Sequence, residues 1–157
     1  MERENRICLR AMKESDVPMA AELERECFSD AWSEKLLLEM IGSSYDEAWV
    51  LAHPEGGLIG YLNVRFLAGE GELMRIAVKK EYRGLGYSRK LMEQMVKSAA
   101  EMGIQDLTLE VRAGNEPAIN LYKSYGFKKE AVRRGYYHDP TEDAFIMWRR
   151  GLPVIPS

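Results

Sequence analysis

Cysteine is scarce in this sequence of 157 residues, and its two cysteines, Cys8 and Cys27, stand far apart. Two cysteines at such a spacing form neither a metal-binding motif nor a disulfide framework, so we expect no metal and reduced thiols. Long apolar runs are also missing, because no stretch approaches the length that spans a membrane. Residues 1–16 have no apolar core like that of a signal peptide. These absences predict a cytoplasmic protein with no membrane partner.

The chain also has little excess of charge of one sign. Its 22 lysines and arginines and 25 aspartates and glutamates give a net charge of −3, which argues against nucleic acid as a partner of the whole chain. The basic residues gather around 79–90 and at 128–134, where they could bind a small polyanion. The sequence contains no internal repeat, linker or low-complexity segment, so we expect a single domain over residues 1–150 and a short C-terminal tail at 151–157.

The spacing of apolar residues predicts the order of helices and strands. Ser15-Asp16-Val17-Pro18 is typical of a helix start, with a capping residue before a proline, and Ser33 can cap a second helix. The resulting order βααβββαβαββ describes an α+β fold with a central mixed, mostly antiparallel sheet flanked by helices. We expect strands at about 5–11, 47–53, 57–66, 71–78, 105–112, 127–137 and 142–149, and helices at about 15–28, 33–41, 86–102 and 113–126.

A glycine-rich turn, EYRGLGYS at 81–88, lies between the strand expected at 71–78 and the helix expected at 86–102. Two glycines before a helix leave backbone N–H groups unshielded, and the first N–H groups of a helix attract anions. We therefore predict a site for a phosphate-bearing ligand; the alternative is a tight strand–helix turn without a ligand. The turn is not a P-loop, because no Gly-Lys-Ser/Thr follows, and it lacks the third glycine of a Rossmann fingerprint. Five basic residues surround the turn, opposed only by Glu81: Lys79, Lys80, Arg83, Arg89 and Lys90.

Three polar residues that follow are candidates for chemistry. Glu110 stands in an otherwise apolar strand, where partial burial raises the pKa of a carboxylate toward a range that suits a general base. It could instead be an exposed strand residue or a partner of Arg112 or Arg75. Asn115 could simply cap its helix, and Tyr122 could either pack in the core or donate a proton to a leaving group.

Phe28 and Trp32 lie in the loop between the first two helices, where they could be core anchors or line a substrate groove. Together with the turn and the residues above, they make the chain similar to a known family. It resembles the GNAT superfamily of acyl-CoA-dependent N-acyltransferases, and within it the bacterial RimI-type enzymes, which acetylate the N-terminal alanine of a small-subunit ribosomal protein. The CoA motif of the superfamily, Gln/Arg-x-x-Gly-x-Gly/Ala, matches residues 81–86, with Glu81 at the first position. Features typical of the RimI-type enzymes are Phe28 through Trp32-Ser33, Leu109-Glu110-Val111-Arg112, Asn115, Leu121-Tyr122, Gly126-Phe127, Tyr136-Tyr137, Glu142-Asp143-Ala144 and Met147.

The resemblance implies a GNAT-like fold and transfer of an acetyl group from acetyl-CoA to a protein N-terminus, with a ribosomal protein as the partner. It implies that Glu110 accepts a proton and that Tyr122 donates one. The residues that it implies for acetyl-CoA are Ile76, Ala77, Val78, Arg83, Gly84, Leu85, Gly86, Tyr87, Ser88 and Asn115, and those for the peptide N-terminus are Phe28, Trp32, Tyr136 and Tyr137.

Elementary chemistry agrees with these roles. An α-amino group has a pKa of about 8, so at neutral pH it is mostly protonated and cannot attack a thioester. Glu110, directly or through a water, could remove that proton, and a strand N–H near Ala77 could stabilise the oxyanion. The CoA thiolate could then take a proton from Tyr122. No covalent enzyme intermediate is needed, in agreement with the lack of a cysteine or serine beside a suitable base.

Other functions remain open at the level of sequence. A related enzyme could acetylate a lysine side chain, a polyamine, an amino acid or an antibiotic amine, although the tyrosine pair and the loop at 28–32 favour a peptide. A non-catalytic CoA-binding or partner-binding module would bind acetyl-CoA without turnover, and the presence of both Glu110 and Tyr122 argues against it. We expect a monomer or a weak dimer.

Overall fold

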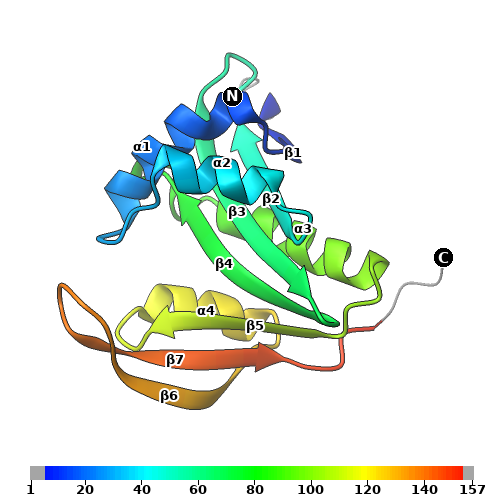
Figure 1. Cartoon of the computed structure of the whole chain (residues 1–157), viewed down its shortest axis with the longest axis vertical. Helices are drawn as coiled ribbons and strands as arrows, with labels where there is room; N and C mark the ends of the chain where they lie inside the picture. The colour runs from blue at the N-terminus through cyan, green and yellow to red at the C-terminus, as the bar shows by residue number, and fades with distance from the viewer. Residues whose placement is uncertain (1–5, 154–157) are drawn as a thin grey trace. The chain divides into compact units, whose positions relative to one another are not determined.

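The computed structural model describes residues 6–153, and its elements follow the predicted order (Figure 1). Asn5 of the first expected strand and residues 154–157 of the expected tail lie outside the described residues. The strands are β1 (Cys8–Ala11), β2 (Asp46–Ala52), β3 (Leu58–Leu67), β4 (Glu70–Val78), β5 (Asp106–Arg112), β6 (Lys128–Tyr137) and β7 (Glu142–Arg149). The helices are α1 (Val17–Cys27), α2 (Glu34–Gly42), α3 (Tyr87–Glu101) and α4 (Glu116–Ser124), with 3₁₀ helices η2 (Glu14–Asp16) and η3 (Lys80–Tyr82).

The strands form a seven-stranded sheet in the order β1-β2-β3-β4-β5-β7-β6. β4 and β5 pair in parallel, whereas β1 with β2, β2 with β3, β5 with β7, and β6 with β7 are antiparallel. The predicted α+β fold with a mixed, mostly antiparallel sheet is therefore confirmed.

The chain consists of two compact units. Unit 1 comprises Met1–Arg65 and Met74–Met95, and unit 2 comprises Phe66–Leu73 and Val96–Ser157. The expected single domain over residues 1–150, with its tail at 151–157, stays a prediction.

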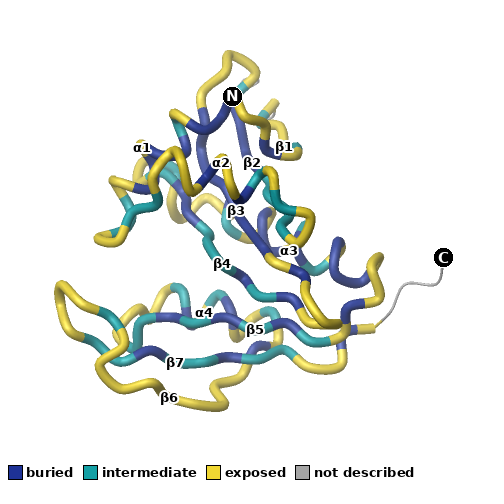
Figure 2. The backbone as a smooth tube through the Cα atoms, viewed as in Figure 1, coloured by how far each residue is buried: buried dark blue, intermediate teal, exposed yellow. Residues whose placement is uncertain are grey.

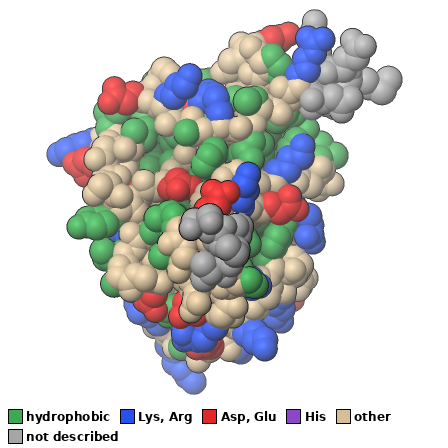
Figure 3. Space-filling model, turned by 90° about the vertical axis from the view of Figure 1, so that its right-hand side faces the viewer, with side chains coloured by type: hydrophobic (Ala, Val, Ile, Leu, Met, Phe, Trp, Pro, Cys, Tyr) green, Lys and Arg blue, Asp and Glu red, His purple; other side chains and the backbone are tan. Residues whose placement is uncertain are grey.

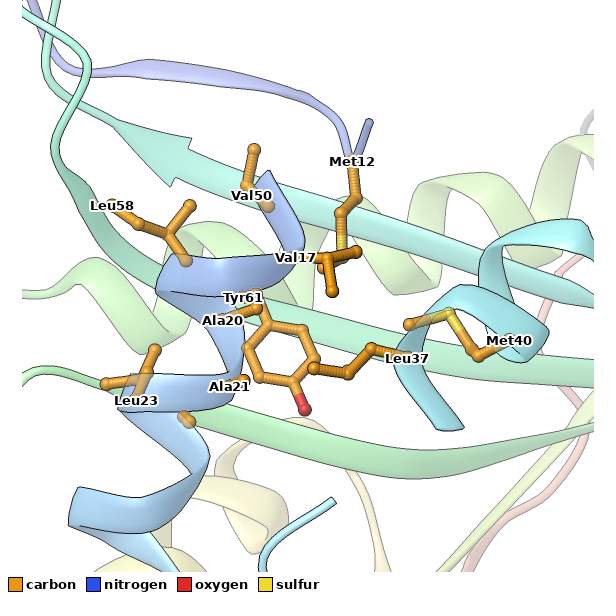
Figure 4. Packing of buried hydrophobic residues seen from close by; sticks show 11 residues of the cluster. Met12, Val17, Ala20, Ala21, Leu23, Leu37, Met40, Val50, Leu58 and Tyr61 are labelled. Atoms are coloured by element: carbon orange, nitrogen blue, oxygen red, sulfur yellow. The ribbon is translucent and has the colours of Figure 1, made fainter. Parts of the chain in front are cut away.

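The core of unit 1 lies between its helices and strands. Figure 1 shows α1 and α2 in front of β2, β3 and β4, with the first part of α3 behind these strands. The ring of Tyr61, on β3, is fully buried and lies beside Leu37 of α2 in Figure 4. One apolar cluster joins α1, α2 and these strands: Met12, Val17, Ala20, Ala21, Leu23, Leu37, Met40, Val50, Leu58, Tyr61 and Ala77.

The two helix starts predicted in unit 1 differ in how they are capped. Ser33 caps α2 as predicted, because its Oγ accepts a hydrogen bond from the backbone N–H of Leu36 at 3.2 Å. Asp16 stands at the N-cap of α1, but its side chain makes no capping bond, so that part of the prediction is wrong. Its carboxylate instead accepts two bonds from Arg10 and one from the N–H of Lys13, all at 2.8 Å. Competition from a nearby guanidinium explains the difference.

Unit 2 is built on β5, whose side chains alternate as predicted. Leu107, Leu109 and Val111 are buried, while the residues between them are half-buried. In Figure 1, α4 lies behind β5, and it buries Ile119 and Tyr122. β6 is exposed along nearly its whole length, as the yellow trace in Figure 2 shows. Charged side chains on β5 and β6 are therefore open to ligands on at least part of their surface.

Candidate active site

The glycine turn of unit 1 joins β4 to α3 through η3. Gly84 and Gly86 have φ angles of +76° and +87°, a region that favours glycine, and a Cβ on either would meet no atom within 4 Å. The glycines are therefore required by the backbone conformation and not by close packing. α3 begins at Tyr87, so the first N–H groups of the helix lack partners within it. This geometry fits the predicted anion site.

The cations near this turn are only partly available for a ligand. Arg83 Nε donates to the carbonyl of Val78 at 3.0 Å, and its Nη2 lies 3.3 Å from Cys27 Sγ. Arg83 is thus tied to the end of β4, and the Lys90 ammonium lies 5.8 Å from the centre of the Tyr87 ring. Burial raises the pKa of the Cys27 thiol and so disfavours its thiolate form.

The strand segment expected to bind acetyl-CoA lies directly before this turn. Ile76, Ala77 and Val78 are the last three residues of β4. The β4–β5 ladder pairs Glu70 to Leu73 with Asp106 to Leu109, so the three residues lie beyond the paired stretch. Cofactor binding by their backbone stays a prediction.

Phe28 and Trp32, the aromatic residues expected to contact the acceptor, are both half-buried and pack against the core of unit 1. The guanidinium carbon of Arg75 lies 4.0 Å from the centre of the Phe28 ring and 4.7 Å from that of Trp32. The structure therefore brings the two rings together on one cation. Their role in binding a substrate stays a prediction.

Sequence reasoning missed the role of Glu24 in this arrangement. Its side chain is fully buried on α1, and Oε1 accepts from the Trp32 N–H at 2.8 Å and from Arg75 Nη2 at 3.0 Å. Oε2 accepts a short hydrogen bond from the Tyr61 hydroxyl, and burial followed by the charge of Glu24 raises the pKa of that phenol. Glu24 stands four residues after the buried Ala20, on the same face of α1. A carboxylate at that spacing was a signal that a buried partner was required.

In unit 2 the side chain of Glu110 is 23% exposed and lies 3.6 Å from Arg133 Nη1. The Tyr136 hydroxyl donates to Glu110, and this bond is the main reason that the pKa of Tyr136 is raised. The structure thus joins the expected base to one of the tyrosines expected to bind the acceptor. Arg112, named from sequence as a partner of Glu110, forms an ion pair with Glu142 at 3.5 Å.

Arg112 also fixes the turn between β6 and β7. Its guanidinium donates to the carbonyls of His138 and Pro140 at 3.4 and 3.3 Å, and its Cζ lies 4.3 Å from the centre of the Tyr137 ring. Tyr136 and Tyr137 meet edge to face with ring centres 5.1 Å apart. Both tyrosines are therefore held by contacts to β5 residues.

Tyr122 is buried, with 6% of its surface exposed, and its ring meets Phe127 edge to face at 6.1 Å. Burial, and to a smaller extent the nearby Tyr137, raises the pKa of this phenol. The hydroxyl therefore keeps its proton throughout the neutral range, and its role as a proton donor stays a prediction. Asn115 caps α4 as the structural alternative predicted, since its Oδ1 accepts from the Ala118 N–H at 3.3 Å; its contact with the cofactor stays a prediction.

Within residues 6–153 no group of three or more His, Cys, Asp or Glu side chains could hold a metal ion, and the expectation that none is needed stays a prediction. No helix of that same range is long and apolar enough to cross a membrane.

The family to which the chain belongs is shown by comparison with known proteins. The chain belongs to the acetyltransferase (GNAT) family, whose model matches residues 17–127.

Named relatives extend this similarity over nearly the whole chain. The chain is 32% identical to a putative [ribosomal protein bS18]-alanine N-acetyltransferase of Bacillus subtilis over 141 residues, covering 89% of this chain and 93% of that protein. It is 33% identical to the [ribosomal protein bS18]-alanine N-acetyltransferase of Escherichia coli K12 over 146 residues, covering 92% and 95%. The crystal structure of the ribosomal-protein-S18-alanine N-acetyltransferase from Escherichia coli matches with a TM-score of 0.86 at 29% identity, covering 96% and 97% of the two chains. The predicted GNAT-like fold is confirmed.

Proposed function

We propose that this enzyme transfers the acetyl group of acetyl-CoA to the N-terminal α-amine of a protein, and that its acceptor is the N-terminal alanine of ribosomal protein bS18. The observation that carries the proposal is similarity over about nine tenths of both chains to enzymes with that name. Coverage of nearly all of each chain matters because binding residues are often carried by loops, which vary most between related proteins.

In this proposal unit 1 binds the cofactor. The left-handed glycines 84 and 86 and the first turn of α3 bind the pyrophosphate through backbone N–H groups, with Arg83, Leu85, Tyr87 and Ser88 beside them. The backbone of Ile76, Ala77 and Val78 pairs with the pantetheine arm, and an N–H near Ala77 stabilises the oxyanion. Asn115 of unit 2 caps α4, and the family resemblance gives it a contact with the cofactor as well.

Unit 2 supplies the proton transfers in the same proposal. Glu110 takes one proton from the acceptor ammonium, and the free amine attacks the thioester carbonyl. As the C–S bond breaks, Tyr122 gives its proton to the departing CoA thiolate. The second proton of the new amide nitrogen returns to the Tyr122 oxygen, and Glu110 releases its proton to solvent. We also propose, from the family resemblance, that Tyr136 and Tyr137 contact the acceptor N-terminus. The same resemblance gives this role to Phe28 and Trp32.

The acceptor is tested by incubating the enzyme and acetyl-CoA with purified bS18 that has a free N-terminal alanine. The matched control is the same protein with its N-terminus already acetylated. Peptide mapping by mass spectrometry should place one acetyl group on the α-amine of the free protein and none on the control. Acetylation of lysine side chains in both samples would contradict the proposal, as would acetyl-CoA binding without any transfer.

A further inference from the structure

The loop at 28–32 is held by a side chain from a distant strand. Arg75 lies on β4, and only 11% of its side chain is exposed. Its Nη2 donates to Glu24 Oε1 at 3.0 Å and to the carbonyl of Asp30 at 2.8 Å, so it binds both α1 and the loop backbone. Its guanidinium also lies against the rings of Phe28 and Trp32. One cation therefore fixes the backbone of the loop and both of its aromatic side chains.

Glu24, on α1, binds both Arg75 and the end of the loop. It is fully buried, and it accepts from the Trp32 N–H, from Tyr61 and from Arg75. A buried carboxylate is strongly disfavoured without its cation, so Glu24 and Arg75 hold each other in place. The end of the loop at Trp32 is thereby tied to α1 through a side chain, although the loop has no helix or strand of its own.

The guanidinium of Arg75 contacts two aromatic rings, but not all of its N–H groups are hydrogen-bonded. Within the described part of the chain, Arg75 Nε is buried and has no hydrogen-bond partner. Such a donor costs stability, and a pair that served only the fold would be expected to satisfy it. The guanidinium carbon instead lies over the rings of Phe28 and Trp32, a cation–π contact by which arginine can fix aromatic rings.

We propose that Arg75 is a positioning residue for the acceptor: with Glu24, it holds Phe28 and Trp32 in the arrangement that receives the acceptor peptide. The inference rests on the proposed function, in which these two rings bind the acceptor N-terminus. Arg75 does not touch the reacting atoms. Its side chain faces the loop, whereas the backbone of the residues after it serves the cofactor, so the two kinds of binding respond differently to its loss.

The test compares Arg75→Lys and Arg75→Met with the wild-type enzyme. Lysine keeps the charge but loses the planar fork that binds two acceptors and stacks on rings. We expect the KM for an acceptor peptide to rise on the order of 10- to 100-fold in both variants, while the Kd for acetyl-CoA stays unchanged. The matched control is Arg10→Met, which removes another arginine–carboxylate pair of unit 1 and should leave the peptide KM as it was.

A second readout does not depend on activity. Protein labelled with ¹⁵N-tryptophan reports the backbone amide of Trp32, whose N–H is bonded to Glu24. Its hydrogen exchange should be faster in both Arg75 variants and unchanged in Arg10→Met. Trp49, which lies in the ladders of β2 with β1 and β3, is the internal reference.

The outcomes separate this proposal from the proposed function. If the wild-type enzyme does not acetylate the peptide, the proposed function fails, and Trp32 exchange still decides whether Arg75 holds the loop. A folded Arg75→Lys enzyme with wild-type exchange and wild-type peptide KM would overturn the positioning role. An equal weakening of acetyl-CoA binding would overturn it as well. Loss of folding in both Arg75 variants, with Arg10→Met folded, would assign Arg75 to the fold and would also count against the proposal.

Discussion

At the scale of single residues, the proposed reaction depends on where two protons are held. The acceptor amine has a pKa of about 8 and must lose a proton before attack, while the thiolate must gain one. Glu110 keeps a partly exposed carboxylate next to the Tyr136 hydroxyl. Tyr122 keeps a buried phenol with a raised pKa. The proposal therefore assigns the two proton transfers to two different side chains of unit 2.

Replacement of Glu110 by glutamine should lower kcat/KM by about 10²-fold at neutral pH, the usual contribution of a positioned base. Glutamine can still accept a bond from Tyr136 but cannot take the amine proton. Activity should recover as pH rises through the pKa of the amine, because solvent then supplies the free amine. The measurement is kcat/KM against pH for both enzymes, and full activity of Glu110→Gln at neutral pH would remove the base role.

The matched control is Arg133→Gln, which removes the ion pair but leaves the carboxylate. Arg133 is exposed, and exposed pairs contribute little, so kcat/KM should change by no more than about fivefold. An equal loss of kcat/KM in Glu110→Gln and Arg133→Gln would mean that activity requires the ion pair between these residues and not proton transfer to Glu110.

Replacement of Tyr122 by phenylalanine removes the proposed acid and keeps a ring packed against Phe127. Turnover should fall about 10²-fold, with little change in the Kd for acetyl-CoA. Because the pKa of Tyr122 is raised, wild-type activity should show no loss from this group as pH increases through the neutral range. Unchanged turnover in Tyr122→Phe at every pH would exclude the acid role.

At the scale of helices and strands, the sequence predicted most of what the structure contains. The alternation in β5, the Ser33 cap and the glycine turn are local patterns, fixed by residues a few positions apart. The bond between Arg75 and Glu24 joins residues 51 positions apart, so the helical spacing that marks Glu24 as buried does not identify its partner. Asp16 has the right spacing for a cap, but the nearby Arg10 binds its carboxylate.

The candidate site residues Glu110 and Tyr122 were proposed from residue type and resemblance, and their catalytic roles stay predictions. The hydrogen bond between Tyr136 and Glu110 was not expected from the sequence. The β6–β7 register shifts between Arg133 and Tyr137, so simple alternation does not say which face of β6 carries Tyr136. Contacts of this kind require the strand pairing itself.

The glycine turn gives a prediction for an element. Gly86→Ala meets no atom but must adopt a φ of +87°, at a cost of about 1–2 kcal/mol in the free energy of unfolding. A shifted turn loses charge-assisted bonds to phosphate, so the Kd for acetyl-CoA should rise about tenfold or more. Calorimetric titration measures this change.

Gly56→Ala is the control for that substitution. Gly56 has a φ of +102°, also with open space around a Cβ, and it lies in the turn between β2 and β3. Gly56→Ala should lower the free energy of unfolding by about as much as Gly86→Ala does, without raising the Kd for acetyl-CoA. Equal loss of binding in both variants would show that the turn at 84–86 has no special role.

At the scale of the whole molecule, stability depends on buried acids while the surface carries mixed charge. Lysine and arginine side chains alternate with aspartate and glutamate on the face seen in Figure 3, in keeping with a net charge of −3. Asp16 is 2% exposed, and hydrogen bonds from Arg10 lower its pKa. A carboxylate whose pKa is lower in the folded state stabilises the protein above its unfolded pKa of about 3.9. That contribution is lost as pH falls through the folded pKa.

Asp16→Asn should therefore lower the free energy of unfolding at pH 7 by about 2 kcal/mol, the scale of hydrogen bonds to a charged group. The difference from wild type should shrink as the medium becomes strongly acidic, where Asp16 is protonated in both states. Urea unfolding at a series of pH values measures it. Glu130→Gln, which breaks the exposed pair with Arg150, should leave stability unchanged; a constant deficit of Asp16→Asn at all pH values would contradict the account.

The central claim, acetylation of a free α-amine, is tested most directly by CoA thiol release from acetyl-CoA with a peptide that begins with alanine. The same peptide with a blocked N-terminus is the control. The account predicts release with the free N-terminus and none with the blocked one. Equal release from both, or release from neither, would contradict it.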